Sequence, residues 1–283
     1  MAEVDIVGIV GSGMMGAGLV EVVARTGHHV IVRSRTRAGS EAVVANVTAS
    51  LSRQIDKGSL PATAGDEILR RITATEHLGR LESCDLVVES VVEDLPTKRE
   101  LFAELDQVVK PSAILATNTS TLPVVELAMA TQRPDQVCGI HFFNPAPQMR
   151  LVEVVRPITA SDDTIKTALT FATTCGKDAI EVVDRAGFVV NALLFPYLNN
   201  AVRMYELGTA AIEDIDTAMC GGCNFPIGPF ALLDLVGLDT SVAILEALHA
   251  EFGDPSLAPA PTLRRKVAAG QLGRKTGRGF YRY

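Results

Sequence analysis

A glycine-rich turn near the start of the chain restricts the possible folds more than any other feature of this sequence. Residues 4–10 are mostly apolar and β-branched, which predicts a buried strand. Residues 11–16 then read Gly-Ser-Gly-Met-Met-Gly, an amphipathic helical stretch follows to Thr26, and residues 29–33 predict a second strand. This order of strand, Gly-x-Gly-x-x-Gly, helix and strand is the setting of the dinucleotide-binding fingerprint in α/β folds.

Each position of this turn has a physical task in a dinucleotide-binding fold. Gly11 permits the tight turn, Gly13 lets the backbone approach a pyrophosphate, and Gly16 lets the helix pack on the strand. Met14 and Met15 belong to the turn, and the N-terminus of the helix that follows faces the phosphate charge. A glycine turn that only packs is the alternative, but the flanking strands and helix favour a cofactor site.

The end of the second strand indicates which nicotinamide cofactor is bound. NAD-binding folds usually place an Asp or Glu there to bond the ribose 2′-hydroxyl. This chain has Arg33, Ser34 and Arg35 instead, without an acid. A hydroxyl flanked by guanidinium groups suits a 2′-phosphate, because arginine forms charge-assisted bidentate bonds to phosphate. The sequence therefore favours NADP over NAD, with a solvated basic loop as the alternative explanation.

The pattern of the sequence changes near residue 185. Before it, apolar runs that predict strands alternate with helical stretches, and after it only helical periodicity remains. The expected fold class is α/β, with a Rossmann-type N-terminal domain over 1–185, built on a mainly parallel sheet, and an all-helical C-terminal domain over 186–283. Further strands are expected over 85–92, 113–117, 137–142, 151–155 and 179–183, the last two as antiparallel additions. The expected C-terminal helices cover 188–206, 212–220, 229–251 and 262–269.

Charge and cysteine content argue against several function classes. The net charge of −7 argues against binding to nucleic acid, which needs a basic face. Five scattered cysteines are too few for a disulfide framework, and no apolar run is long enough to span a bilayer. Cys220 and Cys223 have CxxC spacing, but no second such pair completes a zinc site, so they predict a helix end. We expect a cytoplasmic protein with no metal, no nucleic-acid partner and no membrane partner.

One histidine has a position suited to proton transfer. An enzyme that transfers hydride from an alcohol carbon needs a base for the hydroxyl proton, and histidine is the usual choice near neutral pH. Of the five histidines, only His141 is expected to end a strand at the ligand-binding edge of the sheet. Glu153 is the carboxylate that a strand-turn-strand segment could bring beside it, to orient the ring and stabilise its cation. A packed core histidine is the alternative.

A set of short segments recurs in the same order in a known family. They cover residues 11–16, 91–94, 118–120, 141–145, 151–154, 187–191, 226–230, 234–239 and the glycine-rich basic tail from Gly273. The chain thereby resembles the short-chain L-3-hydroxyacyl-CoA dehydrogenase family, most closely its bacterial 3-hydroxybutyryl-CoA dehydrogenases, over essentially its whole length. The resemblance implies an NAD(P)-dependent oxidoreductase that interconverts (S)-3-hydroxyacyl-CoA and 3-oxoacyl-CoA. It also implies a homodimer formed through the helical C-terminal domain.

The resemblance assigns catalytic roles to individual positions. His141 would act as general base or acid, and Glu153 would stabilise its cationic form. Ser120 and Asn191 would bond the substrate oxygens, and Asn144 would support the arrangement of His141 and Glu153. In this mechanism the hydroxyl proton passes to His141 while hydride leaves C3 of the thioester.

The resemblance also assigns binding roles. The cofactor contacts that it adds to the glycine turn and the strand end are Glu93, Lys98, Asn118 and Ser120. Ser50 and Lys57 match positions that touch coenzyme A, and their spacing of two turns on one predicted helix suits a phosphate group. An ordinary surface lysine is the alternative for Lys57. The family usually has Asp where Ser34 stands, which is the departure behind the preference for NADP.

Two other functions stay open on the sequence. A homologue could act on a hydroxyacyl group attached to acyl carrier protein, or on a free hydroxy acid. It would use the same His141 and Glu153 but leave Ser50 and Lys57 idle. A nucleotide-sensing binding protein could use this fold without catalysis, although such a protein would be expected to lose part of the catalytic set.

Overall fold

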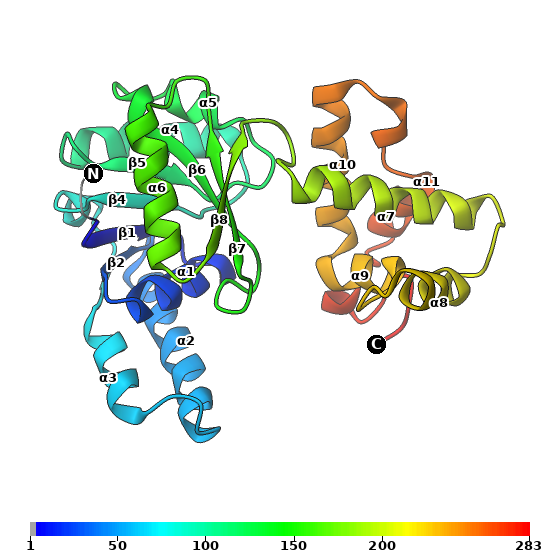
Figure 1. The fold of residues 1–283 in the computed structure, drawn as a ribbon, viewed down its shortest axis with the longest axis horizontal. Helices are drawn as coiled ribbons and strands as arrows, with labels where there is room; N and C mark the ends of the chain where they lie inside the picture. Colours follow the sequence, from blue (N-terminus) through cyan, green and yellow to red (C-terminus); the bar gives the residue numbers. More distant parts are fainter. Residues whose placement is uncertain (1–3) are drawn as a thin grey trace. The chain divides into compact units, whose positions relative to one another are not determined.

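The chain folds into two compact units, one ending at Asp184 and the other running from Arg185 to Tyr283. The structure is a computed structural model that describes residues 4–283. A helix-covered sheet forms the first unit and helices form the second, which confirms the expected fold class (Figure 1). No helix within the described range combines the length and the apolar character needed to cross a membrane.

A single sheet organises the first unit. Within residues 4–184 its eight strands lie in the order β3 (Ile72–Thr75), β2 (His29–Arg33), β1 (Ile6–Val10), β4 (Leu86–Glu89), β5 (Ile114–Thr117), β6 (Val137–Phe142), β7 (Leu151–Arg156) and β8 (Asp178–Val183). The first six of these are mutually parallel, and β7 pairs with β6 in the antiparallel sense. Strands β2 and β3 lie on one side of β1, and β4 to β8 lie on the other, so the strand order reverses between β1 and β4. Open α/β sheets bind ligands at such a switch point.

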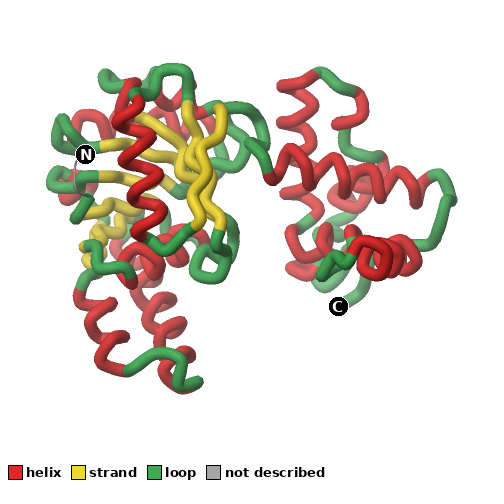
Figure 2. Tube along the Cα trace, in the orientation of Figure 1, coloured by secondary structure: helices red, strands yellow, loops and turns green. Residues whose placement is uncertain are grey.

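Helices cover both faces of this sheet, as Figures 1 and 2 show. One face carries α1 (Met14–Arg25), α2 (Arg37–Asp56), α3 (Ala62–Arg70) and α6 (Asp162–Thr174), whose apolar side chains share one core with the strands. The other carries α4 (Leu95–Val108) and α5 (Val124–Ala128), and short 3-10 helices span Leu78–Leu81 and Pro134–Gln136. Strands β4, β5 and β6 are buried along their whole length. Covering on both faces explains why they read as continuous apolar runs.

One strand of the first unit is not predicted, and the two expected antiparallel additions are present. The sequence does not predict β3, a four-residue edge strand with two exposed residues that directly follows α3. The prediction of antiparallel additions is confirmed: β7 pairs with β6 in the antiparallel sense and β8 lies parallel to β7, so both strands run opposite to the first six. The shared direction of β7 and β8 agrees with α6 between them, because two strands joined by a helical crossover lie parallel.

The second unit is built from α7 (Val190–Glu206), α8 (Ile212–Cys223), α9 (Pro229–Val236), α10 (Leu238–Phe252) and α11 (Pro261–Ala268), with 3-10 helices over Pro255–Leu257 and Arg274–Thr276. Their apolar faces meet around the fully buried Phe230. The single helix expected over 229–251 is two helices, because Gly237 breaks it with a φ of +104°. Cys220 and Cys223 lie in the last turn of α8, in agreement with the predicted helix end.

The glycine-rich tail has a structural role in this unit. The carboxylate of Asp234 accepts hydrogen bonds from the backbone N–H groups of Phe280 and Tyr281, each at 2.8 Å. The Phe280 ring packs against Phe230 with its centroid 4.7 Å away. A Cβ atom at Gly279 would lie 1.9 Å from Oδ1 of Asp234, so only glycine allows this close approach.

Candidate active site

Steric limits explain two of the three fingerprint glycines. Gly11 has a φ of +136°, and a Cβ atom there would lie 2.2 Å from the carbonyl oxygen of Ser90, which follows β4. A Cβ atom at Gly16 would lie 2.3 Å from the carbonyl oxygen of Gly11. Both positions therefore need glycine to let β1 turn sharply into α1 and pack against the chain after β4.

Gly13 differs from them because it faces open space. A Cβ atom there would meet no atom within 4 Å, and no side chain caps the N-terminus of α1. The first-turn N–H groups of α1 therefore have no side-chain acceptor, and Met14 beside them is 75% exposed. A helix N-terminus with free N–H groups suits a pyrophosphate, so the turn fits a dinucleotide cofactor.

The end of β2 is uncharged at the position where NAD-binding folds carry an acid. Ser34 is buried there, and its hydroxyl lies 3.1 Å from the hydroxyl of Ser12 in the glycine turn. The guanidinium of Arg33 donates a hydrogen bond to the Glu76 carbonyl oxygen at 3.3 Å. Arg35 is exposed, which leaves its guanidinium accessible to a ligand.

The antiparallel pairing of β6 and β7 brings together the predicted catalytic pair. Its register sets His141 directly opposite Glu153, and Nδ1 of His141 lies 2.8 Å from Oε2 of Glu153. Glu153 is fully buried and His141 is 5% exposed. Because an ionised carboxylate can only accept, the ring donates its Nδ1 hydrogen to Glu153. The lone pair at Nε2 then remains available to accept a proton.

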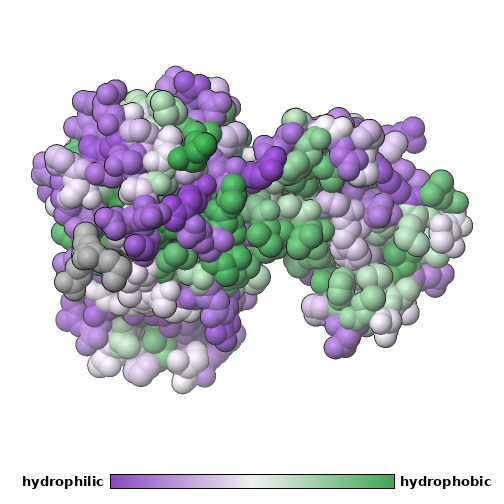
Figure 3. Space-filling model, turned by 45° about the horizontal axis from the view of Figure 1, so that its top comes forward, coloured by the Kyte–Doolittle hydropathy of each residue, from purple (hydrophilic) through white to green (hydrophobic). Residues whose placement is uncertain are grey.

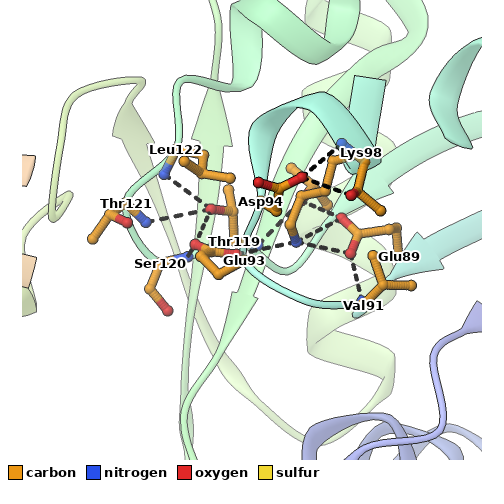
Figure 4. A network of polar contacts seen from close by, with 11 residues as sticks. Glu89, Val91, Glu93, Asp94, Lys98, Thr119, Ser120, Thr121 and Leu122 are labelled. Atoms are coloured by element: carbon orange, nitrogen blue, oxygen red, sulfur yellow. Dashed lines mark hydrogen bonds and ion pairs between the residues drawn. The ribbon is translucent and has the colours of Figure 1, made fainter. Parts of the chain in front are cut away.

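Ser120 lies next to Nε2 of His141. It belongs to the loop after β5, and its hydroxyl oxygen is 3.2 Å from Nε2 of His141. Its backbone N–H donates a hydrogen bond to Oε1 of Glu93 at 3.0 Å, and the Thr119 hydroxyl donates to the same oxygen (Figure 4). Ser120, His141 and Glu153 thus form a continuous chain of contacts at the carboxyl edge of the sheet.

Opposing effects set the acidity of Glu93. Burial raises the pKa of its carboxyl group, whereas the charge of Lys98 and hydrogen bonds from Thr119 and Ser120 lower it. The lowering effects dominate, so the pKa of Glu93 lies below its ordinary value. Glu93 is therefore ionised at neutral pH and acts as a hydrogen-bond acceptor for the Ser120 loop.

Two asparagines of the predicted site have different surroundings. Oδ1 of Asn118 accepts a hydrogen bond from the Phe142 backbone N–H at 2.8 Å, which ties the end of β5 to the residue after His141. Asn144 is exposed and is joined to Pro145 by a cis peptide bond. The cofactor contact assigned to Asn118 and the supporting role assigned to Asn144 remain predictions.

A cavity of about 640 Å³ lies among α1, α2 and the loop after His141. Ser50 and Lys57, the residues expected to touch coenzyme A, both line it. Arg25 and Arg53 line it as well, which gives the cavity a basic character suited to phosphates. These two arginines carry no motif in the sequence that would identify them.

Lys177 is a further residue of this cavity that the sequence does not predict. Its ammonium donates hydrogen bonds to the carbonyl oxygens of Ala146 at 2.6 Å and Met149 at 2.8 Å, and burial lowers its pKa. These bonds tie the loop that follows His141 to the start of β8. The only sequence signal is a lysine after a glycine at the end of α6, which is too common to identify such a role.

Asn191, the remaining predicted substrate residue, belongs to the second unit. It lies in the first turn of α7 and is 8% exposed. The structure thus brings Ser120, His141, Glu153 and Glu93 into contact within the first unit, and Ser50 and Lys57 into its cavity. The role assigned to Asn191 remains a prediction.

Comparison with known proteins identifies the family. Residues 6–185 match the family described as "3-hydroxyacyl-CoA dehydrogenase, NAD binding domain", and residues 187–283 match "3-hydroxyacyl-CoA dehydrogenase, C-terminal domain". A 3-hydroxybutyryl-CoA dehydrogenase of Mycobacterium tuberculosis is 46% identical over 279 residues, covering 98% of each chain. One of Clostridioides difficile is 42% identical over 275 residues, covering 97% of this chain and 98% of its own.

A solved structure agrees with these sequence matches. The crystal structure of (S)-3-hydroxybutyryl-CoA dehydrogenase from Ralstonia eutropha has a TM-score of 0.97 and 41% identity to this chain, and 99% of each chain is covered. The family match, the near-complete coverage and the shared fold confirm the resemblance seen in the sequence motifs. The chain belongs to the 3-hydroxyacyl-CoA dehydrogenase family.

Proposed function

We propose that this protein interconverts (S)-3-hydroxybutyryl-CoA and acetoacetyl-CoA by hydride transfer with a nicotinamide cofactor. The observation that carries the proposal is the chain of contacts from Ser120 through His141 to Glu153 at the sheet edge. A turn with free helix N–H groups, suited to a dinucleotide, lies at the same edge. The four-carbon acyl group is supported by relatives that are named as 3-hydroxybutyryl-CoA dehydrogenases.

The geometry supports a direct mechanism of proton transfer. A bound nicotinamide cofactor supplies the hydride acceptor for C3 of the substrate. Nε2 of His141 takes the proton of the substrate hydroxyl, and the buried carboxylate of Glu153 stabilises the imidazolium that forms. The Ser120 hydroxyl holds the reacting oxygen close to Nε2. In the reverse direction His141 returns the proton to the carbonyl oxygen.

A steady-state assay with acetoacetyl-CoA tests this function. We expect rapid oxidation of the reduced cofactor with acetoacetyl-CoA, and kcat/KM values at least about tenfold lower with carrier-bound acetoacetate or free acetoacetate. Coenzyme A would be preferred because its phosphates can bind the cavity lined by Ser50 and Lys57. Equal or faster turnover of either rival would mean that this rival, and not the coenzyme A thioester, is the substrate. Cofactor binding without any turnover would favour the nucleotide-sensing alternative.

We propose further that NADP(H) is the preferred cofactor. The position that would bond a ribose 2′-hydroxyl is Ser34, and Arg35 next to it is exposed. A serine hydroxyl can donate to a 2′-phosphate, whereas a carboxylate would repel it. Arg35 can add a charge-assisted bond from the surface.

Replacing Ser34 with Asp is expected to reverse the cofactor preference. The new carboxylate accepts from ribose hydroxyls and repels a 2′-phosphate, so the ratio of kcat/KM for NADPH over NADH should fall by about tenfold or more. A melting curve of the variant checks that the larger side chain is accepted, because the Ser34 hydroxyl lies close against Gly39. Thr173→Asp adds the same charge on an exposed turn of α6 and should leave the ratio unchanged. An unchanged ratio in Ser34→Asp would contradict the proposed role of Ser34.

We also propose that the protein is a homodimer that works in the cytoplasm. Apolar side chains reach the surface of the molecule (Figure 3), and in the second unit Leu193, Leu207 and Leu235 are 73%, 82% and 53% exposed. Exposed apolar residues of this kind mark surfaces that bind a partner. Sedimentation equilibrium measures the oligomeric state directly.

The cysteines support the proposed compartment. All five are free thiols, which suits a reducing compartment.

A further inference from the structure

A buried network of charges lies behind the Ser120 loop. It consists of Glu89 at the end of β4, Lys98 in the first turns of α4, and Glu93 in the loop between them (Figure 4). Glu89 is fully buried and Lys98 is 1% exposed, whereas the side chain of Glu93 is 40% exposed. Buried charges are costly unless they are paired, so the network has to be satisfied internally.

Lys98 uses its whole hydrogen-bonding capacity inside this network. Its Nζ atom lies 2.8 and 2.9 Å from the two carboxylate oxygens of Glu89, and 3.1 Å from Oε2 of Glu93. An ammonium group has three donors, and these three oxygens account for all of them. Because all three donors are used in this way, we expect Lys98 to influence the site through its ion pair with Glu93.

Glu89 holds the ammonium in place from the other side. Its Oε1 accepts a hydrogen bond from the Val91 backbone N–H at 2.6 Å, and its Oε2 accepts one from the Thr117 hydroxyl at 2.8 Å. Thr117 ends β5, so Glu89 joins the ends of two neighbouring strands. Four contacts on one buried carboxylate define its position, and through it the position of Lys98.

Glu93 links Lys98 to the loop that carries Ser120. Its Oε2 contacts Lys98, while its Oε1 accepts from the Ser120 N–H and the Thr119 hydroxyl. The Ser120 hydroxyl then contacts Nε2 of His141. Without the ion pair, the half-exposed side chain of Glu93 would be free to turn toward solvent and release the loop.

We propose that Glu89 and Lys98 are positioning residues for the reaction, holding Ser120 against His141 through Glu93. The inference rests on the proposed function for the step that Ser120 and His141 perform. Small displacements of a catalytic group from its productive geometry can reduce the rate strongly, which makes a rigid support for Ser120 valuable. The other ion pair near β4, between Asp85 and Lys110, lies at the opposite end of that strand and offers a matched control.

The test uses a double variant that preserves the net charge of the network. Glu89→Gln with Lys98→Met removes one carboxylate and the ammonium together, which leaves Glu93 intact but without its ion pair. We expect kcat at saturating cofactor to fall by about tenfold or more, with the KM for acetoacetyl-CoA changed by less than about threefold. Glu93→Gln breaks the same link without touching the buried pair. It should show the same pattern, which covers the case in which the double variant does not fold.

A cycle with Ser120→Ala separates positioning from a general structural role. If the network acts through Ser120, the Glu93→Gln and double variants should lower kcat by less than about threefold when Ser120 is already alanine. Losses that multiply in the combined variants would overturn the inference. So would an unchanged kcat in Glu93→Gln. Lys110→Met should leave kcat at the wild-type value.

Hydrogen exchange tests the network independently of any activity. The Ser120 amide is hydrogen-bonded to Glu93, so a peptide covering residues 118–122 should exchange faster in Glu93→Gln and in the double variant. Lys110→Met should leave this peptide unchanged. An unaltered exchange rate in both network variants would overturn the inference. The wild-type rate with acetoacetyl-CoA tests the proposed function separately, so a failure there is distinguishable from a failure of the network.

Discussion

Replacing His141 with Gln is expected to abolish most of the activity while leaving cofactor binding intact. Glutamine cannot take a proton near neutral pH, and proton transfer by one positioned group supplies about 10²–10⁴-fold in rate. We therefore expect kcat for acetoacetyl-CoA reduction to fall by at least about 10²-fold. The glycine turn is untouched by the change, so the dissociation constant of the cofactor, measured by fluorescence titration, should stay within about twofold.

The control for this substitution is a histidine of the second unit. His249 lies near the C-terminal end of α10, and His249→Gln should retain the wild-type kcat. A melting curve of each variant checks that the fold is intact. If His141→Gln turned over acetoacetyl-CoA at the wild-type rate, His141 could not be the proton acceptor and the proposed mechanism would be wrong.

The fold is predictable from sequence where the pattern is local. Short apolar runs predict strands, so β2 and β6 are predicted with the bounds that the structure has. The glycine turn is predictable because the steric demands at Gly11 and Gly16 leave no other residue type. In both cases the physical cause lies within a few residues of the feature.

Strand β3 is not predictable in this way. The four residues of β3, Ile-Thr-Ala-Thr, form too short a run to predict a strand, and they pair with the edge of β2. The helix break at Gly237 is also not predicted from hydrophobic periodicity, because the apolar pattern continues across it.

The residues of the candidate site also differ in how far the sequence predicts them. His141 and Glu153 can be paired from the sequence because a strand-turn-strand segment brings two residues twelve positions apart to the same register. Ser120 is identified only through the resemblance to a family. The inward direction of Lys98 is not predictable, because a lysine in the first turns of a helix usually points to solvent. Only the three-dimensional arrangement turns Glu89 and Lys98 into a support for Ser120.

Replacing Glu153 with Gln is expected to lower kcat almost as much as the loss of His141 itself. The carboxylate holds the Nδ1 hydrogen of the ring, so that Nε2 carries the lone pair that accepts the substrate proton. An amide can instead donate to Nδ1, and the hydrogen of the ring then moves to Nε2, where it blocks proton transfer. The amide also lacks the negative charge that stabilises the imidazolium in a buried site. Neutralising the carboxylate partner of a catalytic histidine typically costs about 10⁴-fold, and we expect a loss of about 10²–10⁴-fold here.

The side chain of Gln has the shape of Glu, so the expected loss in Glu153→Gln is chemical rather than structural. Its melting temperature and its affinity for the cofactor should therefore stay close to the wild-type values. Glu181→Gln on the neighbouring strand β8 removes an exposed carboxylate that pairs with Arg156, and kcat should be unchanged there. A Glu153→Gln variant with the wild-type kcat would mean that the orientation of His141 does not depend on the carboxylate. The 2.8 Å contact between the two side chains would then have only a packing role.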